Sequence, residues 1–141
     1  MKARAFMLGL FVAGCGGEED EQDNHGYGYS GFSVQSPVGI KIRYEIDEQI
    51  VSASGIGPAF FDRAFEATVA CTGITASPPP YVIVRSDKAD TICGRYFRAP
   101  PLIVLAGHPL CFPHEVVHYL LEQSTGDPDT AHGSALFAKC G

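Results

Sequence analysis

The chain has 141 residues, of which 45% are hydrophobic, and it carries 16 acidic against 10 basic side chains. Its formal net charge is −6, and it becomes −8 if the two cations Lys2 and Arg4 are removed with an N-terminal leader. This acidic balance argues against nucleic acid, and against an anionic lipid surface, as the partner.

A short apolar run follows two basic residues at the N-terminus and leads into Cys15. Basic residues before an apolar segment of this length are typical of a secretory signal, and the run is too short for a permanent transmembrane helix. Residues 12–15 (Val-Ala-Gly-Cys) resemble a bacterial lipobox. The resemblance implies that residues 1–14 are a lipoprotein signal peptide and that Cys15 is lipidated. We therefore expect an exported protein, lipid-anchored to a bacterial membrane on its periplasmic or cell-surface side.

Residues 15–36 are rich in glycine, serine and acidic side chains and poor in bulky aliphatic ones. Such a segment cannot bury enough apolar surface to offset its ordering entropy, so we expect a flexible tether that includes His25. Residues 37–141 are then one small domain, long enough to bury a lean core.

The first elements of this domain follow from hydrophobic periodicity. Residues 38–46 alternate between apolar and polar, the pattern of a half-buried strand. A helix begins at Pro58 and stops at Gly73, with apolar residues at helical spacing between them. Residues 81–85 form the next strand, and after a turn residues 91–97 form a weaker one.

The second half of the domain contains one more strand and the second main helix. Residues 102–106 are wholly apolar, the pattern of a strand buried on both faces. A bulge is expected at Gly94 in the preceding strand, and His108 is assigned to the connector before a helix over residues 110–123. The predicted fold is therefore α+β: a mixed sheet of about four strands packed on two main helices, with a short C-terminal helix.

The helix over residues 110–123 is the most informative part of the chain, because it contains the pattern His114-Glu115-x-x-His118. Two imidazoles four positions apart lie on one face of a helix, and both can reach a metal ion at about 2.0–2.1 Å. Glu115 lies one step further round, where it suits a general base better than a ligand. The apolar stripe lies on another face, so the two histidines can face a cleft.

A third ligand is needed, because a catalytic zinc ion takes three protein ligands and leaves one position open. Glycine and proline in residues 125–129 must end the helix and turn the chain, so a later side chain can return to the metal. His132 is the preferred third ligand, with Asp129 and Asp127 as alternatives. Asp129 and Glu122 are also candidates for an outer partner of an imidazole N–H.

Apart from Cys15 the chain has four cysteines, namely Cys71, Cys93, Cys111 and Cys140. An even number in an exported domain indicates two disulfides. Three pairings are open, and we favour Cys71–Cys93 with Cys111–Cys140. The alternative is a closed structural zinc site in which Cys111, with Cys140 or His132, joins the two helical histidines.

The order of strands followed by a helix with His114, Glu115 and His118 resembles the zincin metallopeptidases. His132-Gly133 followed by Phe137 is similar to the SprT-type zincins, in which a histidine before a short helix is the third ligand. The chain departs from the metzincins, because residues 123–125 (Gln-Ser-Thr) replace the continuation to their third histidine. A second helix with a glutamate ligand, as in the larger gluzincins, is also not evident.

The resemblance implies one zinc ion, a peptide or protein substrate, and hydrolysis with Glu115 as general base. It also implies that an edge strand over residues 91–97 pairs with extended substrate. Candidates for an oxyanion donor are Tyr119, Tyr96 and Arg98. We expect a monomer. The alternative is a non-catalytic surface lipoprotein, with either a structural zinc site or an inactive zincin-like fold.

Overall fold

The computed structural model describes residues 31–85, 93–106 and 109–141. The strands in these ranges are β1 (Phe32–Gln35), β2 (Lys41–Glu45), β3 (Tyr81–Arg85), β4 (Gly94–Arg98) and β5 (Pro101–Ala106). The α-helices are α1 (Glu48–Ser54), α2 (Pro58–Thr72), α3 (Phe112–Thr125) and α4 (Leu136–Cys140), and a short 3₁₀ turn (Pro109–Cys111) precedes α3. The predicted leader, Cys15 and His108 lie outside the described residues.

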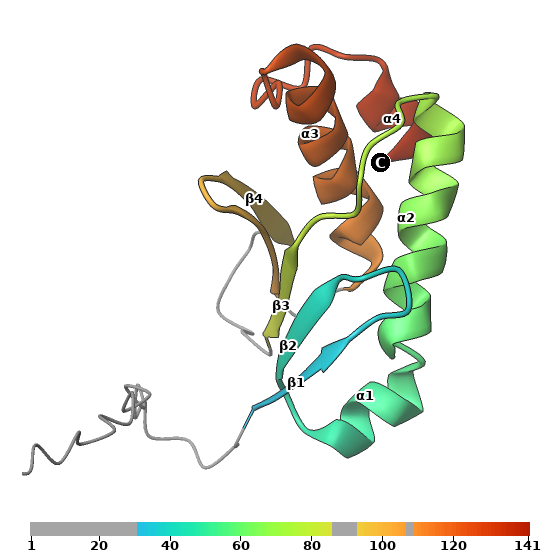
Figure 1. Cartoon of the computed structure of the whole chain (residues 1–141), viewed down its shortest axis with the longest axis vertical. Coiled ribbons are helices and arrows are strands. Elements are labelled where there is room, and N and C mark those ends of the chain that lie inside the picture. The colour runs from blue at the N-terminus through green and yellow to red at the C-terminus, as the bar shows by residue number, and fades with distance from the viewer. Residues whose placement is uncertain (1–30, 86–92, 107–108) are drawn as a thin grey trace, which may run out of the picture.

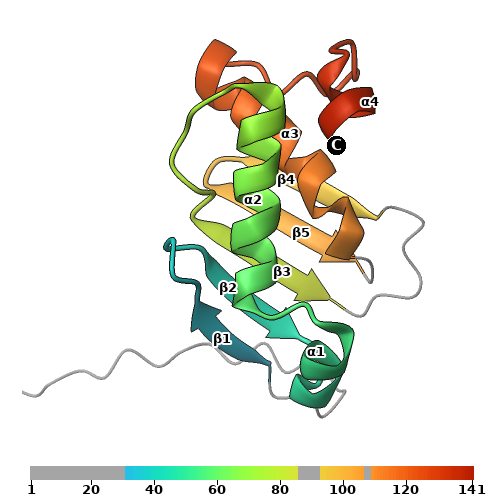
Figure 2. The ribbon, with the colours of Figure 1, turned by 90° about the vertical axis from the view of Figure 1, so that its right-hand side faces the viewer.

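The strands form one mixed sheet in the order β1-β2-β3-β5-β4. β2, β3 and β5 are parallel, and β1 and β4 pair antiparallel at the two edges. Helices α2 and α3 lie side by side on one face of this sheet, with α4 at their far end (Figures 1 and 2). The predicted α+β class is confirmed, with five strands in place of about four.

The additional strand is β1, which lies within the segment that was expected to be a tether as far as residue 36. Phe32 stacks on Tyr44 of β2 with ring centroids 4.8 Å apart, and Val34 pairs with Ile42. Gly31 permits this approach, because a Cβ there would lie only 2.7 Å from the Tyr44 carbonyl oxygen. Only two apolar side chains anchor β1, so its contact with β2 rather than its own pattern stabilises it.

The strand expected over residues 38–46 is shorter than predicted. A tight turn precedes it, in which Gly39 has a φ of 102° and donates its backbone N–H to Ser36 at 3.0 Å. Val38 is therefore 37% exposed instead of lying in the core. The sequence did not predict helix α1, since Val51 is the only buried residue among its seven.

The predicted bounds of α2, β3 and β5 agree with the structure to within one residue. Helix α2 begins at Pro58, and Gly73 ends it in the left-handed conformation with a φ of 72°. In β5, however, Ile103 and Leu105 are fully buried while the alternate residues are only partly covered. The prediction of a strand buried on both faces was wrong, because both main helices cover the same side of the sheet. β4 shows regular pairing from Gly94 onward instead of the expected bulge.

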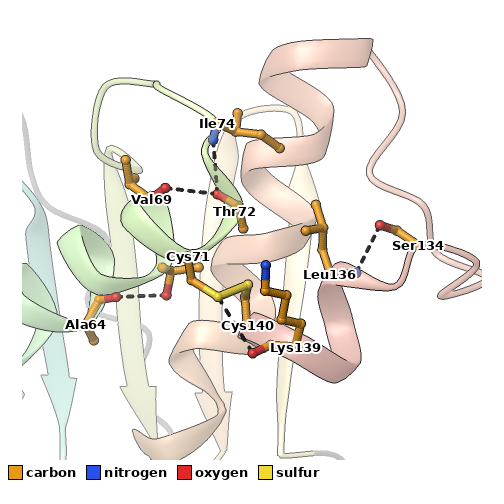
Figure 3. Close-up of a disulfide and its surroundings, with 10 residues drawn as sticks. Ala64, Val69, Cys71, Thr72, Ile74, Ser134, Leu136, Lys139 and Cys140 are labelled. Atoms are coloured by element: carbon orange, nitrogen blue, oxygen red, sulfur yellow. Dashed lines mark hydrogen bonds between the residues drawn. A yellow bond between two sulfur atoms is a disulfide. The ribbon is translucent and has the colours of Figure 1, made fainter.

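Two disulfides connect the elements around α3, the helix that contains His114, Glu115 and His118. The pairing of their cysteines differs from the one we favoured. Cys71 at the end of α2 is joined to Cys140 of α4, as Figure 3 shows. Cys93, before β4, is joined to Cys111, directly before α3. Residues far apart in the sequence pair here because α4 packs beside α2, a neighbourhood that cysteine spacing does not contain. Disulfides are typical of oxidising, extracytoplasmic compartments. Among the described residues, no helix has the length and apolar character needed to cross a membrane.

Candidate metal centre

His114 and His118 lie on the first two turns of α3, which Pro113 can enter because it lies in the first turn. Their ring centroids are 5.2 Å apart, as expected for positions one helical turn from each other. Below them the helix is anchored by Phe112, Val116 and Leu120, all fully buried. The apolar stripe therefore fixes the helix on the sheet and leaves the two imidazoles on a separate side.

The segment after α3 returns a third imidazole to the same place. Gly126 ends the helix with a φ of 78°. Both carboxylate oxygens of Asp129 then accept backbone N–H groups, from Gly133 at 3.0 Å and from Ser134 at 2.6 Å. Asp129 and His132 adopt positive φ angles of 51° and 56°, which non-glycine residues rarely do. The Asp129 carboxylate thus holds a strained turn closed, and these two backbone N–H groups keep its pKa below its usual value.

The imidazoles of His114, His118 and His132 converge. The Nε2 atom of His132 lies 3.1 Å from the Nε2 atoms of both His114 and His118, and the possible ligand atoms of all three lie within 4.8 Å of one another. Tetrahedral zinc with bonds of about 2.0–2.1 Å would separate its ligand atoms by about 3.3 Å. The three histidines predicted as ligands therefore form a group that could hold one metal ion.

The ring of His118 is oriented by a backbone carbonyl. Its Nδ1 lies 2.7 Å from the carbonyl oxygen of Pro128, and since that oxygen can only accept, Nδ1 carries the proton. The neutral ring then presents the lone pair of Nε2 to the other histidines, the form that binds a metal. Burial lowers the pKa of His118, although its bond to Pro128 opposes this change. Burial, and then the neighbouring imidazoles, lower the pKa of His114.

Phe137 of α4 closes the centre from its apolar side. Its ring centroid lies 5.1 Å from that of His114, 4.5 Å from that of His118 and 4.7 Å from that of His132. Only 9% of Phe137 is exposed. Because the ring contacts all three imidazoles, it restricts their rotation and excludes water from one side of the cluster.

The side chain of Glu115 lies against β4. It is 5% exposed, and a Cβ on Gly94 would lie 2.9 Å from its Cγ and 3.0 Å from its Oε1. The backbone N–H of Tyr96 donates to its carboxylate. Burial raises the pKa of Glu115 to about 7, although this N–H and the charge of Arg95 oppose the rise. The carboxyl group therefore sits between α3 and the edge strand, with a pKa suited to proton transfer near neutrality.

Glu122 has a different neighbour from the one expected. Its carboxylate accepts the hydroxyl of Tyr96 and, at 2.6 Å, the Nε of Arg98. Arg98 also donates to the carbonyl oxygen of Gly126 at 2.9 Å. Glu122 thus fastens β4 to the end of α3 instead of accepting an imidazole N–H. The hydrogen bonds of Asp129 likewise go to the backbone of its loop, although its charge also interacts with His132 and His118.

The remaining candidates are placed as follows. The Oδ1 of Asp127 accepts the backbone N–H of Asp129 at 2.8 Å, a turn-forming contact, and the group that could hold a metal ion contains His132 but not Asp127. The hydroxyl of Tyr119 donates to the carbonyl oxygen of Ser77 at 2.8 Å, so its role is to hold the connector before β3. Because Cys111 and Cys140 are in disulfides, the closed zinc site with sulfur ligands is ruled out.

Two features of the centre were missed by sequence reasoning. Gly94 was interpreted as a bulge, whereas close approach of another group to the strand is the other common reason for a strand glycine, and here that group is Glu115. The contact of the Pro128 carbonyl group with His118 could not be predicted from the sequence, since every residue has a backbone oxygen.

None of the protein-family models, curated proteins and solved structures compared with this chain matches it.

Proposed function

We propose that this chain is a zinc-dependent metallopeptidase of the zincin type, held at a bacterial membrane through lipid on Cys15. The observation that carries the proposal is the convergence of three Nε2 atoms, together with a buried glutamate on α3, the helix that contains two of the three histidines. Three protein ligands with an open fourth position are typical of catalytic zinc, whereas structural sites are closed by four ligands.

The residues of the centre divide into holding and reacting groups. His114, His118 and His132 would hold the ion, which lowers the pKa of water to about 7 and polarises a substrate carbonyl. Glu115 accepts the proton of the attacking water and passes it to the amine as the peptide C–N bond breaks. A general base is most effective when its pKa lies close to the working pH, in agreement with the raised pKa of Glu115.

The substrate we propose is an extended peptide or protein segment. Within the described residues β4 pairs with β5 alone, so the backbone groups on its other edge, apart from the Tyr96 N–H that donates to Glu115, are available for an added strand. Gly94 and Tyr96 of this strand contact Glu115 directly. A peptide paired along β4 would therefore pass close to the general base.

Replacement of Glu115 by glutamine, compared with wild type, tests this proposal. Zinc content and hydrolysis of a broad peptide library are both measured, with Glu66→Gln on the exposed side of α2 as the matched control. We expect zinc to be retained and hydrolysis to fall by about 10²–10⁴-fold in Glu115→Gln only. Equal hydrolysis by Glu115→Gln and the wild type would show that Glu115 is not the general base.

The same measurements address the non-catalytic alternative. Wild-type protein that binds zinc but cleaves no library peptide would indicate a metal-binding surface protein without peptidase activity. Protein that takes up no metal even after reconstitution would contradict the centre itself.

A further inference from the structure

The sheet face opposite α2 and α3 has its own pattern of side chains, which we define as the open face. The strand register arranges it in rows across the sheet. One row contains Lys41, Tyr81, Leu102 and Phe97, and the next contains Arg43, Ile83, Val104 and Arg95. In both rows apolar residues occupy the central strands β3 and β5. The cations Lys41 and Arg43 lie on β2, and Arg95 lies on the edge strand β4. We propose that the open face docks on an anionic phospholipid bilayer.

The apolar centre of the open face is accessible. Tyr81 and Phe97 are each 43% exposed, although both are large and aromatic. A shallow hollow of about 520 Å³ lies over β1, β2, β3 and the start of β5, with Gln35, Lys41, Tyr81 and Leu102 among its lining residues. Exposed apolar area of this kind, rimmed by polar groups, is typical of an interaction site.

The charge of the open face is opposite to that of the whole chain. Lys41, Arg43, Arg85 and Arg95 are all exposed there. A third row contains Glu45, Arg85 and Ala106. Glu45 is the only carboxylate in the three rows, and it lies 2.8 Å from the Nε of Arg85 and 3.7 Å from that of Arg43. Four cations therefore face one anion on a protein whose net charge is −6. The net charge argued against an anionic lipid partner, but it does not describe this face.

A bilayer fits these features better than an acidic protein does. Long basic side chains can bury their stems and extend their charges to phosphates, while aromatic rings enter the interface. Lys41 already lies over the ring of Tyr81, 5.4 Å from its centroid, and the guanidinium of Arg95 is 6.0 Å from that of Phe97. A sheet surface with cations beside exposed rings needs no shape complementarity from its partner.

Docking through the open face would leave the metal centre accessible. The three histidines belong to α3 and the loop after it, in the helical layer on the other side of the sheet. The inference therefore does not depend on peptidase activity or on acylation of Cys15. It predicts an additional attachment, and a weak lipid anchor becomes stable when a second signal of this kind is present.

Co-sedimentation with vesicles tests the inference in a chain that begins at Gly16, which lacks the apolar leader and Cys15 but retains every described element. The vesicles are phosphatidylcholine alone or mixed in equal parts with phosphatidylglycerol. We expect binding to the mixed vesicles only, and loss of binding at about 1 M salt, where the screening length is about 3 Å. Equal binding to both vesicle types, or binding to neither, would overturn the inference, the second outcome in favour of an acidic protein partner.

Matched double variants locate the contact. Lys41→Gln with Arg95→Gln removes two cations from the open face, and the partition coefficient should fall about thirtyfold. Arg63→Gln with Lys139→Gln makes the same change of charge at exposed positions on α2 and α4, and binding should remain within about twofold of the original. An equal loss in both variants would contradict docking through this face. Thermal unfolding and zinc content of all proteins exclude a general loss of structure.

Discussion

His132 reaches the metal centre because a carboxylate three residues earlier supports its backbone. Asp129 accepts two N–H groups from residues 133 and 134, and it does so across a turn with two positive φ angles. Such angles cost free energy for residues with a Cβ and persist only when neighbouring contacts compensate. The position of the third imidazole is therefore coupled to a side chain outside the group of three histidines.

Replacement of Asp129 by alanine should weaken zinc binding by about 10–100-fold, the usual effect of losing an outer partner. His132→Ala should weaken it more, since a ligand is lost. Asp47→Ala is the matched control, because Asp47 also accepts a backbone N–H, from Gln49 at 2.7 Å, but at the start of α1. Competition titrations with a zinc chelator give the affinities. An unchanged affinity in Asp129→Ala would mean that the loop keeps its shape without the carboxylate.

Gly94 has no side chain because the Glu115 carboxylate occupies that space. A Cβ there would lie 2.9 Å from Cγ and 3.0 Å from Oε1 of Glu115, so the Glu115 side chain would have to shift. We expect Gly94→Ala to displace Glu115, to lower hydrolysis and to destabilise the domain by about 1–3 kcal/mol. Gly57→Ala, where a Cβ has open space and φ is −66°, should leave hydrolysis unchanged. Equal hydrolysis by Gly94→Ala and Gly57→Ala would show that activity does not depend on the position of Glu115.

Among the secondary-structure elements, β4 and α3 enclose the proposed substrate site, and Tyr96 of β4 contacts α3 twice. The backbone N–H of Tyr96 donates to Glu115, and its phenol donates to Glu122 almost two turns further along α3. Arg98 adds a second contact to Glu122 and one to the last turn of the helix. These contacts set the distance between the edge strand and the helix, and with it the width of the proposed substrate site.

Tyr96→Phe removes the phenol contact but keeps the ring and the backbone N–H. We expect the free energy of unfolding to fall by about 1–2 kcal/mol, because a hydrogen bond to a partly buried carboxylate is lost. If the contact sets the width of the site, KM for peptides should rise as well. Tyr81→Phe on the open face is the control, since that side chain is 43% exposed. Urea unfolding and steady-state kinetics provide both readouts, and equal values for the two variants would contradict the role of the contact.

For the molecule as a whole, the two disulfides close loops of very different length. Cys71 and Cys140 are 69 positions apart, and Cys93 and Cys111 are 18 apart. A longer loop restricts the unfolded chain more, so the chain-entropy model gives about 4 kcal/mol for the first bridge and about 3 kcal/mol for the second. Only the first crosses between the helical layer and the C-terminal helix.

The double variant Cys71→Ser/Cys140→Ser should therefore be less stable than Cys93→Ser/Cys111→Ser by about 1 kcal/mol. The first variant should also lose zinc affinity, because α4 carries Phe137, whose ring contacts all three histidines. Denaturant unfolding and chelator competition measure the two effects. Equal stability, together with unchanged zinc affinity in the first variant, would show that α4 stays in place without its bridge.

Local sequence patterns were sufficient to predict those features that depend on residues close together in the sequence. The bounds of α2 follow from Pro58 and Gly73, and the shared face of His114 and His118 follows from helical spacing alone. The candidate site shares this property, because two of its three ligands and the carboxylate come from one turn of helix. His132 could be proposed as the third ligand, since a glycine and a proline force the chain to turn back in between.

Contacts between distant segments were beyond the sequence, because the same local pattern is compatible with several partners. Phe32 and Val34 become a strand only beside β2, and Glu122 meets Tyr96 and Arg98 only when β4 lies on α3. The pairing of the cysteines depended on which helices pack together, a choice made by the whole core. The residues of one helical turn thus determined which kind of metal centre the chain could form. Packing of the sheet and helices decided how the three histidines are held together, since side chains far apart in sequence meet only after the chain has folded.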